Sequence, residues 1–114
     1  MNTERYFLAE FEELVLLAIE FLGEDAYGVS IRHRIETAGE RRTSFGAIYV
    51  TLERLEKKGY VSSWQGEARP ERGGRAKRHY RVETAGHKAL RDTQTARRKV
   101  RFDVNGQEAV GDLI

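Results

Sequence analysis

The apolar residues near the start of the chain recur at the spacing of a helix. Phe7, Phe11, Leu14, Ala18 and Phe21 follow one another at intervals of three or four, while Leu8, Val15 and Leu22 widen the stripe. This pattern predicts an amphipathic helix over residues 4–22, which ends at Gly23. Its apolar arc is wide for a helix that packs on a single neighbour, so we expect it to meet a second surface as well.

Two more helical patterns follow. In the first, over residues 27–38, Val29, Ile31 and Ile35 form a short stripe that we expect to be buried, and Gly39 ends it. The second begins after Ser44, or Thr43, whose hydroxyl can cap a helix. Its core-facing residues keep the same spacing: Phe45, Ile48, Leu52 and Leu55. Basic residues near its end and Gly59 suit a helix C-terminus.

The period then changes from helical to alternating. The stretches "YVSSWQ" (60–65) and "RHYRV" (78–82) predict two strands of a hairpin with a long connection over residues 66–76. In the first strand we expect Tyr60 and Trp64 to share a face. The helix predicted next, over residues 84–100, has a thin seam of small side chains: Ala89, Thr93, Ala96 and Val100. Such a helix needs a partner.

These elements predict a mainly α chain with a small β-hairpin. Three helices followed by a hairpin are the order of a winged helix-turn-helix, here with one more helix after it. We expect the winged helix-turn-helix domain over residues 4–83, a last helix that needs a partner over 84–101 and a flexible tail over 102–114.

Charge is strongly segregated along the 114 residues, although the formal net charge is only +2. Residues 1–25 hold seven acids and one base, whereas residues 26–101 hold nineteen bases and eight acids. A basic middle of this kind suits a polyanion such as nucleic acid. The absence of cysteine, of a signal-peptide pattern and of a membrane-length apolar run leads us to expect a cytoplasmic protein without a membrane partner.

The third predicted helix presents small and basic residues on its outer face. Ala47 permits close approach to bases, Val50 can contact a thymine methyl, and Arg54 can reach a guanine or a phosphate. Ser44 at its start suits a phosphate, and Arg41 and Arg42 lie just before it. These features predict that the helix enters a major groove by its N-terminal end.

Catalytic and metal-binding patterns are missing from the sequence. There is no nucleophile with a base, no phosphate-binding glycine loop and no metal-ligand spacing among His33, His79 and His87. We expect these histidines at the surface, with His79 facing a phosphate. The sequence therefore predicts neither an enzyme nor a cofactor or metal site.

Three segments resemble the PadR family of bacterial transcriptional regulators in order and spacing. They are "YGVSIRHRI" (27–35), "GAIYVTLERLEKKGYV" (46–61) and "GGRAKRHYRVETAGHKAL" (73–90). The resemblance implies a winged helix-turn-helix homodimer, usually a repressor, on a pseudo-palindromic operator in double-stranded DNA. In that family the C-terminal helix commonly pairs with the N-terminal helix of the other subunit. Here Ala76 stands where the family often has proline, and little sequence follows Val100.

The resemblance also implies roles for individual residues. Tyr27, Tyr49 and Tyr80 match the family's characteristic tyrosines, and residues 75–80 match the basic strand that leaves the wing. The expected wing contacts to DNA are Arg72, Arg75, Lys77 and Arg78. The expected dimer contacts are Phe7, Phe11, Leu14, Ala89, Thr93, Ala96 and Val100. The family also admits a small aromatic effector, for which Trp64 is the candidate contact.

Two other functions remain open at this point. The fold could be a protein–protein interaction module whose basic surface is incidental, and Tyr27 and Tyr49 could pack rather than touch DNA. Single-stranded RNA binding would need aromatic residues exposed on a platform, whereas we expect Tyr60, Trp64 and Tyr80 to be largely buried.

Overall fold

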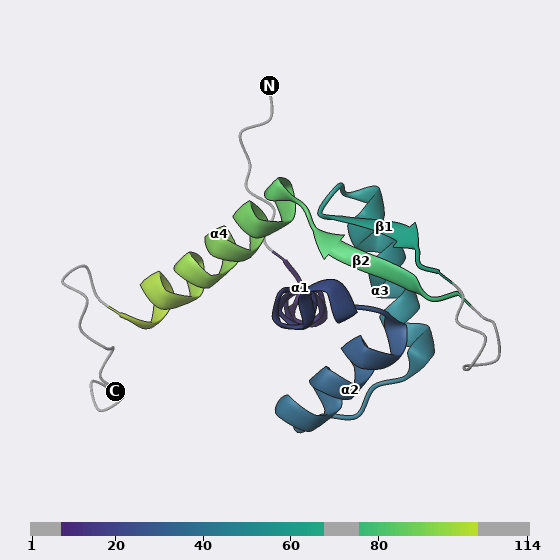
Figure 1. The fold of residues 1–114 in the computed structure, drawn as a ribbon. Helices are drawn as coiled ribbons and strands as arrows, with labels where there is room; N and C mark the ends of the chain where they lie inside the picture. The colour runs from purple at the N-terminus through teal and green to yellow at the C-terminus, as the bar shows by residue number, and fades with distance from the viewer. Residues whose placement is uncertain (1–7, 68–75, 103–114) are drawn as a thin grey trace.

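The computed structural model describes residues 8–67 and 76–102. Its elements, in chain order, are α1 (Glu10–Leu22), the short 3₁₀ turn η1 (Gly23–Asp25), α2 (Gly28–Ala38), α3 (Phe45–Lys57), β1 (Val61–Gln65), β2 (Arg78–Val82) and α4 (Thr84–Arg101). Figure 1 shows α1 at the centre, with α2 and α3 on one side and the hairpin across α3. This is the arrangement that the sequence predicts.

The core lies where α1, α2 and α3 meet the inner face of the hairpin. Its fully buried side chains are Val15, Leu16, Ile19, Ile31, Ile48, Leu52 and Leu55. Val61, Tyr80 and Val82 close the core from the two strands. Burial of these apolar groups is the main force that holds α3 in a fixed orientation, because each contributes about 1.5–3 kcal/mol.

The hairpin is antiparallel, with Val61 opposite Val82 and Trp64 opposite His79. A short bridge adds the segment before α2 to its edge: Tyr27 pairs with His79, and the Tyr80 N–H donates to the Ala26 carbonyl at 2.9 Å. This bridge connects the end of β2 that adjoins the long connection to the N-terminal end of α2.

Helix α4 packs on the rest of the chain through its first half only. Gly86, Ala89, Leu90 and Thr93 are buried, and the Thr93 hydroxyl accepts a hydrogen bond from the Leu8 N–H at 3.0 Å. Figure 1 shows the second half projecting away from the body, and Val100 is 85% exposed. No helix in the described residues is long and apolar enough to cross a membrane.

Several predicted helix ends are confirmed by the backbone. The Ser44 hydroxyl caps α3 by accepting from the Ala47 N–H at 3.0 Å. Gly23 and Gly59 have φ values of 59° and 78°, which glycine adopts without strain. Gly39 forms the C-cap of α2.

Other predictions about the elements are wrong. Helix α1 begins at Glu10, because the Glu12 side chain accepts from the Ala9 N–H and so caps the helix there, while Leu8 lies before it. Tyr27 caps α2 rather than opening it, and β1 begins only after Tyr60. The predicted bounds of the last helix are confirmed, because α4 spans Thr84–Arg101 and Phe102 lies beyond its end; the rest of the predicted tail falls outside the described residues.

Three aromatic or aliphatic side chains are more exposed than expected. Val29 is 58% exposed rather than buried in the α2 stripe, and Phe45 is 39% exposed at the first turn of α3. Both lie in the first turn of their helix. Trp64, at 39%, is also not buried.

Candidate nucleic-acid interface

Helix α3 is anchored by one face and exposed on the other. Ile48, Thr51, Leu52 and Leu55 are buried against α1, α2 and β1. The residues exposed on its other side include most of those predicted to approach DNA: Gly46, Ala47, Tyr49, Val50, Glu53, Arg54 and Lys57. The buried face therefore fixes the direction in which the outer face points.

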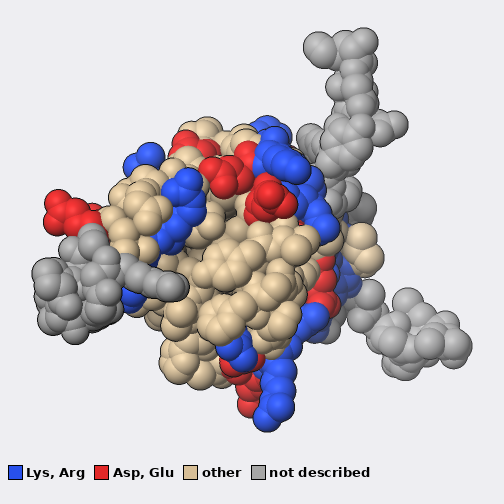
Figure 2. All heavy atoms as spheres, turned by 90° about the vertical axis from the view of Figure 1, so that its right-hand side faces the viewer, with Lys and Arg blue, Asp and Glu red and all other residues tan. Residues whose placement is uncertain are grey.

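The centre of this outer surface is apolar. Val50 is 56% and Tyr49 47% exposed, and Tyr49 stacks on Phe45 with ring centroids 6.4 Å apart. Figure 2 looks at the side of the molecule that carries the wing base and the first half of α3. Uncharged surface fills the middle of that view, and Lys and Arg, interspersed with Asp and Glu, lie around its margin.

Tyr49 packs and is exposed at the same time. Its hydroxyl lies against Gly28 at the start of α2, so closely that a Cβ at position 28 would stand only 2.1 Å from it. The stacked Phe45 holds the ring from the other side. Thus Tyr49 joins the first turns of α2 and α3 into one surface.

A polar hollow lies beside the N-terminus of α3. It has a volume of about 670 Å³ and is lined by Arg32, Glu36, Arg42, Thr43 and Ser44. Arg32 donates to the Thr43 carbonyl, and the Thr43 N–H donates to Glu36, both at 3.0 Å. That backbone hydrogen bond, with the charges of Arg32 and Arg42, outweighs burial and lowers the pKa of Glu36. The cationic rim and the helix N-terminus suit a phosphate.

Two of the predicted basic contacts have other neighbours. Arg41 makes an ion pair with Glu10 at 2.6 Å, on the α1 side of the loop. Lys77 places its ammonium 3.9 Å from the centroid of the Tyr27 ring. Arg78 is exposed opposite Gln65, whereas Arg72 and Arg75 fall outside the described residues.

His79 is not the phosphate-facing surface residue that we expected. Its Nδ1 lies 2.9 Å from the Glu24 carbonyl, and its ring packs between Tyr27 and Trp64 with centroids 5.6 Å from each. His87 is exposed, as expected, but lies 2.6 Å from Glu20. In the described residues, no three His, Asp or Glu side chains are grouped so that they could hold a metal ion.

The predicted dimer contacts divide into two groups. Ala89 and Thr93 are buried within the chain, while Phe11 and Leu14 are half-buried and Phe7 lies outside the described residues. Ala96 is half-buried, and Val100 is exposed. The structure also exposes Leu17 and Phe21, at 36% and 64%, along an apolar groove of about 330 Å³ between α1 and α2.

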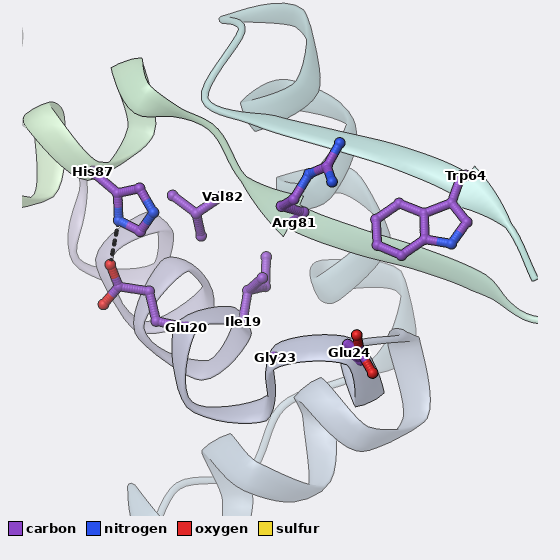
Figure 3. A pocket seen from close by; sticks show the side chains of 8 residues that line it. All are labelled: Ile19, Glu20, Gly23, Glu24, Trp64, Arg81, Val82 and His87. Atoms are coloured by element: carbon purple, nitrogen blue, oxygen red, sulfur yellow. Dashed lines mark hydrogen bonds and ion pairs between the residues drawn. The ribbon is translucent and has the colours of Figure 1, made fainter.

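A second pocket of about 500 Å³ opens beside Trp64. Figure 3 shows Trp64 and Arg81 next to each other on the hairpin, Ile19 and Val82 between the hairpin and α1, and the Glu20–His87 pair at the far end. The Arg81 guanidinium lies 5.4 Å from the Trp64 ring centroid. The pocket thus combines an aromatic wall and apolar side chains with Arg81, His87 and the carboxylates of Glu20 and Glu24.

Three helices, a paired hairpin and an outward-facing third helix define a winged helix-turn-helix protein. The chain belongs to the PadR-like family of transcriptional regulators, whose sequence model matches residues 15–92. No curated protein matches the chain.

Solved structures of similar proteins have the same fold. One is a PadR family transcription regulator from Clostridium difficile R20291, with a TM-score of 0.65 and 20% identity over 81% of this chain and 91% of that chain. Another is a PadR-like transcriptional regulator from Bacillus cereus, with a TM-score of 0.63 and 21% identity over 75% of this chain and 79% of that one. A PadR family regulator from Eggerthella lenta has a TM-score of 0.61 and 25% identity over 76% and 75% of the two chains.

Proposed function

We propose that the protein is a homodimeric repressor that binds a pseudo-palindromic operator in double-stranded DNA. The observation that carries this proposal is the outer face of α3, which is exposed, fixed by a buried opposite face, and bordered by the cations of α2, α3 and the wing. A helix presented in this way fits the major groove. Repression would follow because the bound dimer would keep other proteins off the operator.

Phosphate contacts and base contacts come from different residues in this proposal. Lys77 and Arg78, with Arg72 and Arg75, would bind the backbone from the wing, while Arg42 and Ser44 would bind it at the start of α3. Tyr27 and Arg41 would lie at the edges of this contact, Arg41 after release from Glu10. Ala47, Tyr49, Val50 and Arg54 would face the bases.

The proposed dimer places α4 of one subunit against α1 of the other. Helix α1 carries four acids and no base, whereas α4 carries six Lys or Arg and one Asp. Within one chain Glu13 already pairs with Arg97 at 2.8 Å, and the other three α1 acids have partners in the same chain, so the apolar surfaces carry this part of the proposal. The exposed Val100 end of α4 and the exposed Leu17 and Phe21 of α1 are apolar surfaces that such contacts would bury. A two-fold axis between subunits would present two copies of α3 to two half-sites.

We further propose that the pocket beside Trp64 admits a small aromatic effector. A planar ring can stack on the exposed indole, and Arg81 can meet an acidic substituent. The pocket adjoins the first turn of α4 through His87 and adjoins the wing through Trp64, so a ligand there would contact the dimer helix and the DNA-binding domain together. Trp64 fluorescence quenching by small aromatic acids tests this directly, and a response that persists in Arg81→Ala would contradict the role of Arg81.

The salt dependence of duplex binding tests the main proposal. If several Lys and Arg displace counterions, the logarithm of affinity falls linearly with the logarithm of salt concentration, by about 0.9 per phosphate contacted. We expect a slope that corresponds to several contacts, together with preference for one sequence selected from a random duplex library. Absence of binding to any duplex at low salt would contradict the proposal.

The exposed apolar residues of α3 favour one alternative, a protein–protein interaction module. Protein interfaces commonly have an apolar centre with a polar rim. In that case the α3 surface would bind a protein with unchanged affinity as salt is raised, and duplex DNA would not compete with it.

A further inference from the structure

The centre of the α3 surface offers side chains that make apolar contacts rather than hydrogen bonds. We propose that this surface reads the C5-methyl groups of thymines in the major groove, through Val50 on α3 and Val29 on α2. The inference rests on the proposed function and adds the base chemistry that the operator presents. Val29 enters only because the structure places it outside the core, at 58% exposure.

The Tyr49 hydroxyl joins the first turn of α2 to α3, because it lies against Gly28. Val29 follows Gly28 on α2, Val50 follows Tyr49 on α3, and both valine side chains are exposed. The Tyr49 ring also stacks on Phe45, and the Arg32 guanidinium lies 4.3 Å from the centroid of the Phe45 ring. These contacts hold the two helix segments that carry the valines next to each other.

Duplex DNA fits this surface because of the charge around it. Arg32 and Arg42 lie near the start of α3, Lys57 lies in its last turn, and Lys77 lies over Tyr27 at the wing base. Cations at the margin of an apolar centre match phosphates on both sides of a groove. Within the major groove, the thymine methyl is the one apolar group on a base edge.

The first turns of α3 strengthen the argument. Gly46, Ala47 and Val50 are exposed there and have no side-chain donor or acceptor. They cannot form the bidentate hydrogen bonds by which Arg or Asn recognises guanine or adenine. Sequence preference at the base pairs below them must come from shape and from methyl contacts.

Single replacement of thymine by deoxyuridine tests the inference, because it removes the methyl and keeps base pairing. The probe is the duplex selected from a random library, with each thymine replaced in turn. We expect roughly threefold to fivefold weaker binding at two or more positions of each half-site, from about 0.8 kcal/mol per buried methyl-sized group. Replacements elsewhere should have no effect.

Two protein variants serve as controls for each other. Val50→Ala should lose the response at one thymine and keep it at the other, and Val29→Ala should show the reverse. Both residues are exposed, so neither change opens a cavity, and thermal melting checks that both variants stay folded.

The outcomes separate this inference from the proposed function. If a duplex with deoxyuridine at every thymine binds as tightly as the original, the surface does not read methyl groups, although salt-dependent binding would still support the regulator. If both variants keep the full response at every position, Val29 and Val50 are not the readers. If no duplex binds at low salt, the proposed function fails and this inference fails with it.

Discussion

Glu12 lies buried at the start of α1, where its two carboxylate oxygens have different partners. Oε1 accepts from the Ala9 N–H at 2.9 Å, and Oε2 accepts from the Lys58 ammonium at 2.8 Å. Burial, the largest influence, raises the pKa of this carboxyl, but the hydrogen bonds with the charges of Lys58 and Arg54 lower it overall below 4.5. One side chain thus caps α1 and ties it to the end of α3.

We predict that Glu12→Gln lowers the unfolding free energy by about 1–3 kcal/mol at pH 7. The folded pKa is depressed, so the ionised carboxylate contributes fully above its unfolded pKa, and the contribution disappears as pH falls through the folded pKa. The difference between wild type and variant should therefore shrink below pH 4.5. Urea unfolding of both proteins from pH 7 to pH 3 measures this difference in unfolding free energy. A difference that is constant over this range would contradict the prediction, and Glu53→Gln, at an exposed position of α3, provides the control.

Arg54 is the exposed cation of α3 that we expect to read a base. We predict that Arg54→Ala relaxes preference at one base pair, by about 1–3 kcal/mol of discrimination, while Arg78→Ala weakens binding to all duplexes alike. Competition binding with a set of single-base operator variants distinguishes the two effects. If both variants lose affinity equally on every duplex, Arg54 contacts phosphate only.

At the scale of the element, the approach of α4 to the hairpin, at Tyr60 just before β1 and at Val82 of β2, depends on Gly86. A Cβ there would stand 2.2 Å from the Tyr60 carbonyl oxygen and 2.9 Å from Val82 Cγ1, so backbone would have to move. Gly46 in α3 is different, because a Cβ there would meet only the Ser44 hydroxyl oxygen, at 3.8 Å.

We predict opposite effects for the two glycines. Gly86→Ala should lower the unfolding free energy by about 1–3 kcal/mol through overpacking. Gly46→Ala should raise it by about 0.5–1 kcal/mol, because alanine favours a helix. Thermal and urea unfolding show whether each variant has a higher or a lower unfolding free energy than the wild type. Equal stabilisation by both would mean that α4 does not need this close approach.

The elements themselves could be predicted from periodicity, but the orientation of α1 could not. Leu16 and Ile19 are fully buried although the predicted stripe omits them, and Phe21, which it includes, is 64% exposed. Apolar residues occupy most sides of α1, so the period identifies a helix without showing which side meets the core. Similarly, the period of α3 assigns Phe45 to the core, whereas the structure leaves it 39% exposed, with Arg32 and Tyr49 against its ring.

Only those features of the candidate interface that depend on a single helix could be predicted from the sequence. The Ser44 cap and the exposure of Val50 follow from the pattern of α3 alone. The contact of Tyr49 with Gly28 and the exposure of Val29 depend on how α2 crosses α3, and no local pattern contains that information. Ala89 and Thr93 were expected at a subunit interface, but their small size lets α4 approach α1 and Leu8 within the same chain.

At the scale of the whole molecule, the projecting half of α4 is the part of the chain that the proposed dimer would cover. We predict that Ala96→Glu gives monomers, because it adds a charge to the side of α4 that another subunit would cover. Sedimentation velocity measures the assembly state. Gln94→Glu adds the same charge two residues earlier, on another side of the helix, and should leave the dimer intact. A dimer that survives Ala96→Glu would place the interface elsewhere.

The apolar centre of the α3 surface has a consequence for chemically modified DNA. Cytosine methylated at C5 displays its methyl group at the same place in the major groove as thymine does. A reader that depends on Val29 and Val50 would therefore accept some methylated cytosines in place of thymine. The set of sites that such a regulator occupies would then depend on the cytosine methyltransferases of its cell as well as on the genome sequence.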